Sequence, residues 1–130
     1  MSETTITIPF EITGWDEDVY DEPAEGPKLT QAVVRKRYTG ELEATSVARL
    51  LTAQGDGGRG YLASERVEGT LQGRRGTFVL QHGGVDGDGD LRQFGFVVAG
   101  SGTGELAGLR GTALFAHDED GARLRLSFSL

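Results

Sequence analysis

Hydrophobic and polar residues alternate along most of this chain with a period of two. The alternation is clearest at residues 6–12 and 124–130, near the two ends. A period of two is typical of a strand with one buried and one solvated face. Further runs bring the expected number of strands to eight, at residues 29–39, 41–53, 60–71, 75–84, 91–99 and 109–117. The one helical pattern is a single turn near residues 105–109.

The connections between these runs are rich in glycine and aspartate, as in QGDGGRG, LQGRRG, DGDGD and HDEDGA. Such residues adopt positive φ at little cost, which hairpin turns require. Eight sequential antiparallel strands can pack as a sandwich or close as a barrel. Because closure removes exposed sheet edges, we predict an all-β, single closed eight-stranded antiparallel up-and-down barrel over residues 1–130.

One expected connection, GWDEDVYDEPAEGPK at residues 14–28, is longer than the others and carries six acidic residues. Such a segment is either a solvated acidic loop or a lid over the mouth of the barrel. In the lid interpretation, Trp15 and Tyr20 contact a ligand held in the barrel.

A repeat links two distant parts of the chain. GTLQGRRGTFVLQH at residues 69–82 matches GELAGLRGTALFAH at residues 104–117 in seven of fourteen positions. The glycines predict a strand end, a tight turn and the start of the next strand in each copy. Each copy ends on one of the only two histidines, His82 and His117. Turn chemistry does not explain the histidines.

Composition narrows the range of functions. The 130 residues include 37% hydrophobic and 25% charged residues, which is typical of one soluble domain. The net charge of −7 disfavours nucleic acids and anionic membranes as partners. The absence of cysteine excludes thiol chemistry, and two separated histidines do not indicate a metal site, so we expect neither metal nor cofactor. The first residues lack the features of a signal peptide, which favours a cytoplasmic protein.

Candidate chemistry lies where polar residues share a strand face with large apolar ones. Tyr61 and Glu65 share one face, and Phe78 and His82 share another. If these faces line the lumen, burial would raise the pKa of Glu65 and make it a candidate general acid or base. Counted from the turn at Gly73, His82 lies nearly level with Glu65 across the hairpin. The alternatives are an internal glutamate held by Arg or Tyr, or a histidine at the barrel rim.

The runs at 75–84, 91–99 and 109–117 are apolar on both faces. One face must point away from the lumen, and an exposed apolar patch usually marks an interface. We therefore expect a homo-oligomer, most simply a symmetric dimer, with these strands at or near the contact.

Several segments carry a family resemblance that covers nearly the whole chain. GWDE, YTGEL, SERVEGTLQGRRGTFVLQHGG and GSGTGELAGLRG are similar to signature blocks of a bacterial family, domain of unknown function 3224. Residues 102–111, GTGELAGLRG, also resemble the glycine signature of the allene oxide cyclase-like barrels, a group that includes the plant dirigent proteins. Leu106 takes an aromatic position of that signature. The resemblance implies a barrel fold and no assigned activity.

Allene oxide cyclases close a strained epoxide inside an apolar lumen, and their catalytic glutamate lies in a first-strand Tyr-Glu-Ile-Asn motif. The similar stretch here is Phe10-Glu11-Ile12-Thr13, so the resemblance implies Glu11 as the catalytic carboxylate. Alternation places Glu11 on the polar face of its strand, unless Pro9 introduces a bulge.

Three functions fit these observations. The first is an isomerase or cyclase acting on a small, mostly apolar or amphipathic metabolite in the lumen. The second is a non-catalytic ligand-binding or dirigent-like protein, and the third is a structural oligomer with a filled lumen. The candidate catalytic residues are Glu65, His82 and Glu11. The candidate ligand contacts are Trp15, Tyr20, Tyr61 and Phe78.

Overall fold

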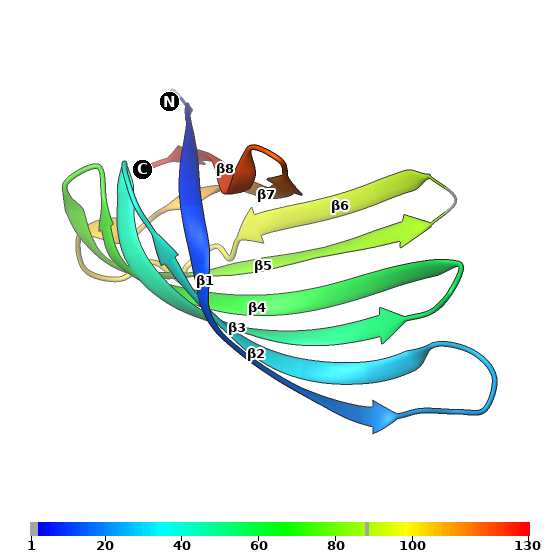
Figure 1. Cartoon of the computed structure of the whole chain (residues 1–130). Coiled ribbons are helices and arrows are strands. Elements are labelled where there is room, and N and C mark those ends of the chain that lie inside the picture. Colours follow the sequence, from blue (N-terminus) through cyan, green and yellow to red (C-terminus); the bar gives the residue numbers. More distant parts are fainter. Residues whose placement is uncertain (1–2, 88) are drawn as a thin grey trace.

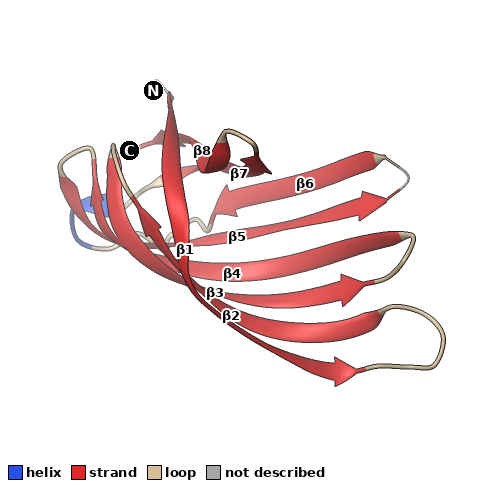
Figure 2. Ribbon diagram, in the orientation of Figure 1, coloured by secondary structure: helices blue, strands red, loops and turns tan. Residues whose placement is uncertain are grey.

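The structure, a computed structural model, describes residues 3–87 and 89–130, and most of them lie in strands (Figure 2). The strands are β1 (Thr4–Asp21), β2 (Lys28–Tyr38), β3 (Leu42–Gln54), β4 (Gly58–Leu71), β5 (Arg74–Gly87), β6 (Asp90–Val97), β7 (Arg110–Asp118) and β8 (Gly121–Ser129). Within the described residues, one 3-10 turn, η1 (Gly104–Leu106), precedes β7. The prediction of an all-β fold with eight antiparallel strands is confirmed. No helix of the described chain is long and apolar enough to span a membrane.

The strand order is that of a closed barrel, β1 to β8 in sequence, with β1 also paired to β8. The closure covers only part of the strands. β1 pairs with β8 over Thr4–Pro9, and β6 meets β7 in one pair, Phe96 and Thr112. We call this part of the sheet the closed half.

Beyond the closed half, the sheet continues as a six-stranded surface that we call the open half. Figure 1 shows these ends of β1–β6 reaching well past the short strands β7 and β8. Among the described pairings, residues 14–21 of β1 pair with β2 alone, and residues 90–95 of β6 pair with β5 alone. The open half therefore has two free edges, one on β1 and one on β6. The short strands β7 and β8 cover only part of its inner face.

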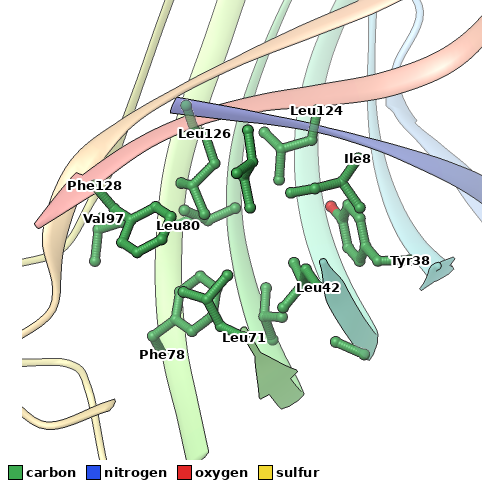
Figure 3. Close-up of a cluster of buried hydrophobic side chains, with 14 of the residues drawn as sticks. Ile8, Tyr38, Leu42, Leu71, Phe78, Leu80, Val97, Leu124, Leu126 and Phe128 are labelled. Atoms are coloured by element: carbon green, nitrogen blue, oxygen red, sulfur yellow. The ribbon is translucent and has the colours of Figure 1, made fainter. Parts of the chain in front are cut away.

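Side chains fill the interior of the closed half (Figure 3). Most of the inward positions in the closed half are apolar, with small residues such as Ala44 on β3 and Ala113 on β7 among the large ones, as expected for a packed barrel core. Phe78 belongs to this core and is only 1% exposed, and its expected contact with a ligand stays a prediction. The largest fully buried side chains here are Ile8, Tyr38, Leu42, Leu71, Phe78, Leu80, Leu106, Leu109, Leu124 and Leu126.

The expected acidic connection is mostly strand, so both the loop and the lid interpretations are wrong for residues 14–21. This segment continues β1 and pairs with β2, with Trp15 opposite Val34 and Asp18 opposite Gln31. A register shift between Ile12 and Gly14 marks a bulge, after which Trp15 lies on the same face as the buried Val34. Backbone pairing with β2 overrides the weak strand propensity of the acidic residues.

The two copies of the repeat adopt different structures. The first forms the predicted hairpin, with Gln72 and Gly73 at positive φ between β4 and β5. The second begins in η1, so the prediction of a strand end there is wrong. The segment before η1 packs on the start of β5, where Thr103 N–H donates to the Thr77 carbonyl at 2.8 Å. A Cβ on Gly76 would lie 2.0 Å from the Thr103 carbonyl oxygen, so Gly76 permits this approach.

Candidate functional site

Glu65 lies where the closed and open halves meet, and its side chain is fully buried. Oxygen Oε1 accepts from Lys36 Nζ at 3.0 Å and lies 2.9 Å from His82 Nε2. Oxygen Oε2 accepts from the hydroxyls of Tyr38 and Ser46, each at 2.6 Å. The Glu65 carboxylate on β4 therefore contacts side chains from three other strands, β2, β3 and β5.

Strand register brings these side chains together. Lys36 on β2 lies opposite Ser46 on β3, and Ala48, two residues further along β3, lies opposite Glu65 on β4. Inward-facing residues on neighbouring strands are within reach of long side chains along the diagonal. Lys36 and Glu65 reach across β3 to form an ion pair, with Nζ 3.0 Å from Oε1.

The ionisation of Glu65 differs from the sequence-based expectation. Burial, the largest effect, raises its pKa, but the hydrogen bond with His82, the charge of Lys36 and the hydroxyls of Ser46 and Tyr38 together outweigh burial. The pKa of Glu65 is lowered to about 2, so the expectation of a raised pKa is wrong. Glu65 is a carboxylate at neutral pH and can orient other groups, but it holds no proton to donate.

The expected proximity of Glu65 and His82 is confirmed by the 2.9 Å distance between Oε1 and Nε2. The two residues are not level, since Glu65 pairs with Leu80 and His82 pairs with Ala63. Their side chains bridge this offset of two residues along the hairpin. The role of the pair in chemistry stays a prediction.

Tyr61 extends the hydrogen-bonded chain toward the open half. Its hydroxyl lies 2.9 Å from His82 Nδ1, and its side chain is half-buried. Burial first, and then the charge of Glu65, raise the pKa of Tyr61 to about 12, so this residue is a neutral phenol. A continuous path therefore runs from the buried Glu65 carboxylate through the His82 imidazole to a phenol at the edge of the site.

Aromatic rings surround the charged groups of the site. The His82 ring lies 4.3 Å from the Phe115 ring, centroid to centroid. The Lys36 ammonium lies 4.3 Å from the Phe115 centroid and 4.8 Å from the Phe10 centroid, within cation–π range. His117 packs edge-on against Phe10, and its pKa is lowered by burial and by the charge of Lys36.

The inner face of the open half presents exposed apolar side chains on β1, three strands from Tyr61 on β4. Trp15 is 50% exposed and Val19 is 46% exposed. Glu17 accepts from Trp15 Nε1 at 2.9 Å and from Thr30 Oγ1 and Gln54 Nε2, each at 2.7 Å. These bonds hold the free edge of β1 against β2 and β3, and they lower the pKa of Glu17.

The structure does not bring the remaining candidate residues to this site. Glu11 is exposed on the outer face, where its carboxylate lies 4.0 Å from Arg37, so the catalytic role implied by the resemblance is not supported. The bulge that could have turned Glu11 inward is not at Pro9. The register shift in β1 comes later, between Ile12 and Gly14. Tyr20 is 55% exposed on β1 and makes no lid.

Sequence reasoning missed Lys36, Tyr38 and Ser46. A signal for Lys36 was present, because it replaces an apolar residue in the alternation of Ala32, Val34 and Tyr38 along β2. A lysine on a buried strand face needs a partner of opposite charge. That partner, Glu65, could not be identified without the register of β2, β3 and β4.

A family model described as "Protein of unknown function (DUF3224)" matches residues 6–130. The chain is also similar to a protein of unknown function from the DUF3224 family of Shewanella oneidensis MR-1, known from a crystal structure at 1.84 Å resolution. The two share 36% sequence identity with a TM-score of 0.90, and the match covers 99% of this chain and 98% of that chain. No curated protein matches the chain.

Proposed function

Because the chain belongs to the DUF3224 family of proteins of unknown function, we propose a function from the chemistry of its own site. The protein binds a small, mostly apolar metabolite against the inner face of the open half. His82, through Tyr61, then donates a proton to a carbonyl oxygen of that metabolite while a solvent water removes a proton from the neighbouring carbon, as in a cofactor-independent isomerase or cyclase. The ligand lies on the open half, since side chains fill the closed half.

The chain of hydrogen bonds from Glu65 through His82 to Tyr61 carries this proposal. A buried carboxylate that orients an imidazole, which in turn contacts a hydroxyl, is a recurrent arrangement for moving a proton. The resemblance to the allene oxide cyclase-like barrels supports the same class of reaction. The carboxylate here lies on β4, in contrast to the first-strand glutamate of that group.

A second function is non-catalytic binding of the same metabolite, as in a carrier or a dirigent-like protein. It is favoured by the full set of partners of Glu65, which leaves both carboxylate oxygens occupied. In this case Tyr61 and His82 only hydrogen-bond the ligand.

The two functions are separated by proton exchange on a simple apolar ketone. We would incubate 4-tert-butylcyclohexanone with the protein in deuterated water and follow α-deuteration by NMR. Trp15, the only tryptophan, reports binding by its fluorescence. Catalysis predicts faster exchange that is lost in Tyr61→Phe and retained in Tyr20→Phe, which removes a hydroxyl from an exposed tyrosine on β1. Binding without exchange supports the carrier function, and no Trp15 response to this and similar ketones contradicts both.

We also propose that the protein is a homo-oligomer, most simply a symmetric dimer, with β5–β7 at or near the contact. Large apolar side chains are exposed on these strands and their neighbours, which usually marks an interface. The residues are Leu51, Leu62, Val85, Phe94, Phe96 and Leu114. Light scattering at tens of micromolar should give twice the chain mass, and Phe96→Asp should reduce it. A wild-type monomer would contradict this proposal.

A further inference from the structure

We propose that the protonation of His82 determines whether Tyr61 offers the ligand a hydrogen-bond donor or only an acceptor, so that a carbonyl ligand binds with uptake of one proton. This inference rests on the proposed function, since it requires a ligand oxygen next to Tyr61. It is carried by the two contacts of the His82 ring, one to Glu65 and one to Tyr61.

In the neutral form of His82, only one ring nitrogen carries a proton. Glu65 is ionised and accepts hydrogen bonds only, so that proton lies on Nε2 and is donated to Glu65. Nδ1 is then an acceptor, and the hydroxyl proton of Tyr61 is donated to it. In this form Tyr61 has only its oxygen lone pairs to present to a ligand.

In the protonated form, both ring nitrogens of His82 are donors. Nε2–H still donates to Glu65, and Nδ1–H now donates to the oxygen of Tyr61. The hydroxyl proton of Tyr61 is released from His82 and can be donated to a ligand oxygen. One proton on His82 therefore reverses the hydrogen-bonding polarity of Tyr61 toward the open half.

The charges around His82 favour an electron-rich ligand atom in the protonated form. Glu65 and Tyr61 face it from β4, Lys36 and Tyr38 reach the same carboxylate from β2, and Ser46 does so from β3. Of these groups, Glu65 and Lys36 are charged and balance each other. His117, on β7, is a further titratable group beside this site and packs edge-on against Phe10. Protonation of His82 leaves one unbalanced positive charge, which attracts a carbonyl oxygen and stabilises negative charge that develops on it.

The ligand class follows from hydrogen-bonding capacity. A ketone oxygen only accepts, so it binds Tyr61 well when His82 is protonated and poorly when His82 is neutral. The matched alcohol both donates and accepts, so it can bind either form. Neither compound titrates between about pH 5 and pH 9, so any difference in pH dependence comes from the protein.

The experiment measures the Kd of 4-tert-butylcyclohexanone and of 4-tert-butylcyclohexanol as a function of pH, using Trp15 fluorescence. For a ligand that binds only the protonated form, Kd rises about tenfold for each pH unit once most of the protein has lost that proton. We expect this rise for the ketone and a change of less than about twofold for the alcohol. Equal pH dependence for the two compounds would overturn the inference.

Variants locate the effect within the site. Tyr61→Phe should remove the pH dependence of ketone binding, whereas His117→Gln, which changes the only other histidine, should retain it. A pH dependence that persists in Tyr61→Phe, or disappears in His117→Gln, would overturn the inference and leave the proposed function standing. If neither compound binds at any pH, both the inference and the proposed function are wrong.

Discussion

The closed and open halves use the same six strands, β1–β6, for different purposes. In the closed half, β7 and β8 complete the barrel, and side chains such as Leu80 and Leu126 are fully buried. In the open half, the inner face is left partly uncovered, with Trp15 at 50% and Val19 at 46% exposure. The same pattern of alternation thus gives a packed core at one end and a candidate ligand surface at the other.

The comparison of the two halves shows where a small barrel can hold buried charged and hydrogen-bonding side chains. A buried ion pair costs desolvation energy unless its remaining hydrogen bonds are satisfied. The Glu65 cluster lies at the boundary, where the core supplies burial and Tyr61 gives access from the open half. We therefore expect stability to depend on the closed half and ligand binding on the open half.

The largest expected effect separates the two halves by stability. Phe78→Ala removes a buried ring from the closed half and should lower the free energy of unfolding by about 3–5 kcal/mol. Trp15→Ala removes a larger, half-exposed side chain from the open half and should cost less than about 1 kcal/mol. Denaturant unfolding checks both values. Equal losses would show that the open half is as tightly packed as the closed half.

Glu65→Gln tests the boundary between the halves. It leaves the buried Lys36 ammonium without a counter-charge and should destabilise the fold by roughly 3 kcal/mol. A loss below about 1 kcal/mol would show that the ion pair does not hold the two halves together.

The same group predicts a pH dependence. The folded-state pKa of Glu65, about 2, lies below its unfolded value, so its contribution is present above the unfolded pKa and is lost as pH falls. The difference in stability between wild type and Glu65→Gln should therefore shrink from about pH 5 toward pH 2. A constant difference across this range would contradict the ionised state of Glu65.

Gly76→Val tests the contact between the start of β5 and the segment before η1, in the closed half. Its Cβ would lie 2.0 Å from the Thr103 carbonyl oxygen, and we expect a loss of about 1–3 kcal/mol. Gly57→Ala is the matched control, because a Cβ there meets no heavy atom within 4 Å. Similar denaturation midpoints for the two variants would contradict the close approach.

Tyr61→Phe has the smallest expected effect on stability and the largest expected effect on function. It removes one hydrogen bond, to His82, at the edge of the site and should cost about 1 kcal/mol. Ketone binding at low pH should weaken by about tenfold, the usual scale of one lost hydrogen bond. Unfolding and Trp15 titration on the same sample check this separation, which is contradicted if binding is unchanged or if the variant unfolds.

Local patterns predicted the strands and the Glu65–His82 pair, because one tight turn at Gly73 fixes how β4 and β5 face each other. Lys36 was not predicted as a partner, because it lies two strands away and its position depends on two further registers. The direction of the Glu65 pKa shift was missed because the prediction considered burial, which raises the pKa, and not the hydrogen bonds of His82, Ser46 and Tyr38 and the charge of Lys36, which together outweigh it. The strand at residues 14–21 was missed because β2, rather than its own acidic sequence, stabilises it.

The most direct test of the candidate site is the nitrogen-15 NMR spectrum of the His82 ring in the free protein. We expect neutral His82 to carry its proton on Nε2, next to Glu65, and Nδ1 to accept from Tyr61. Tyr61→Phe should then shift the Nδ1 resonance, while His117→Gln leaves it in place. A proton on Nδ1 in neutral His82, or an Nδ1 resonance that does not respond to Tyr61→Phe, would contradict the chain from Glu65 to Tyr61 on which the proposed function rests.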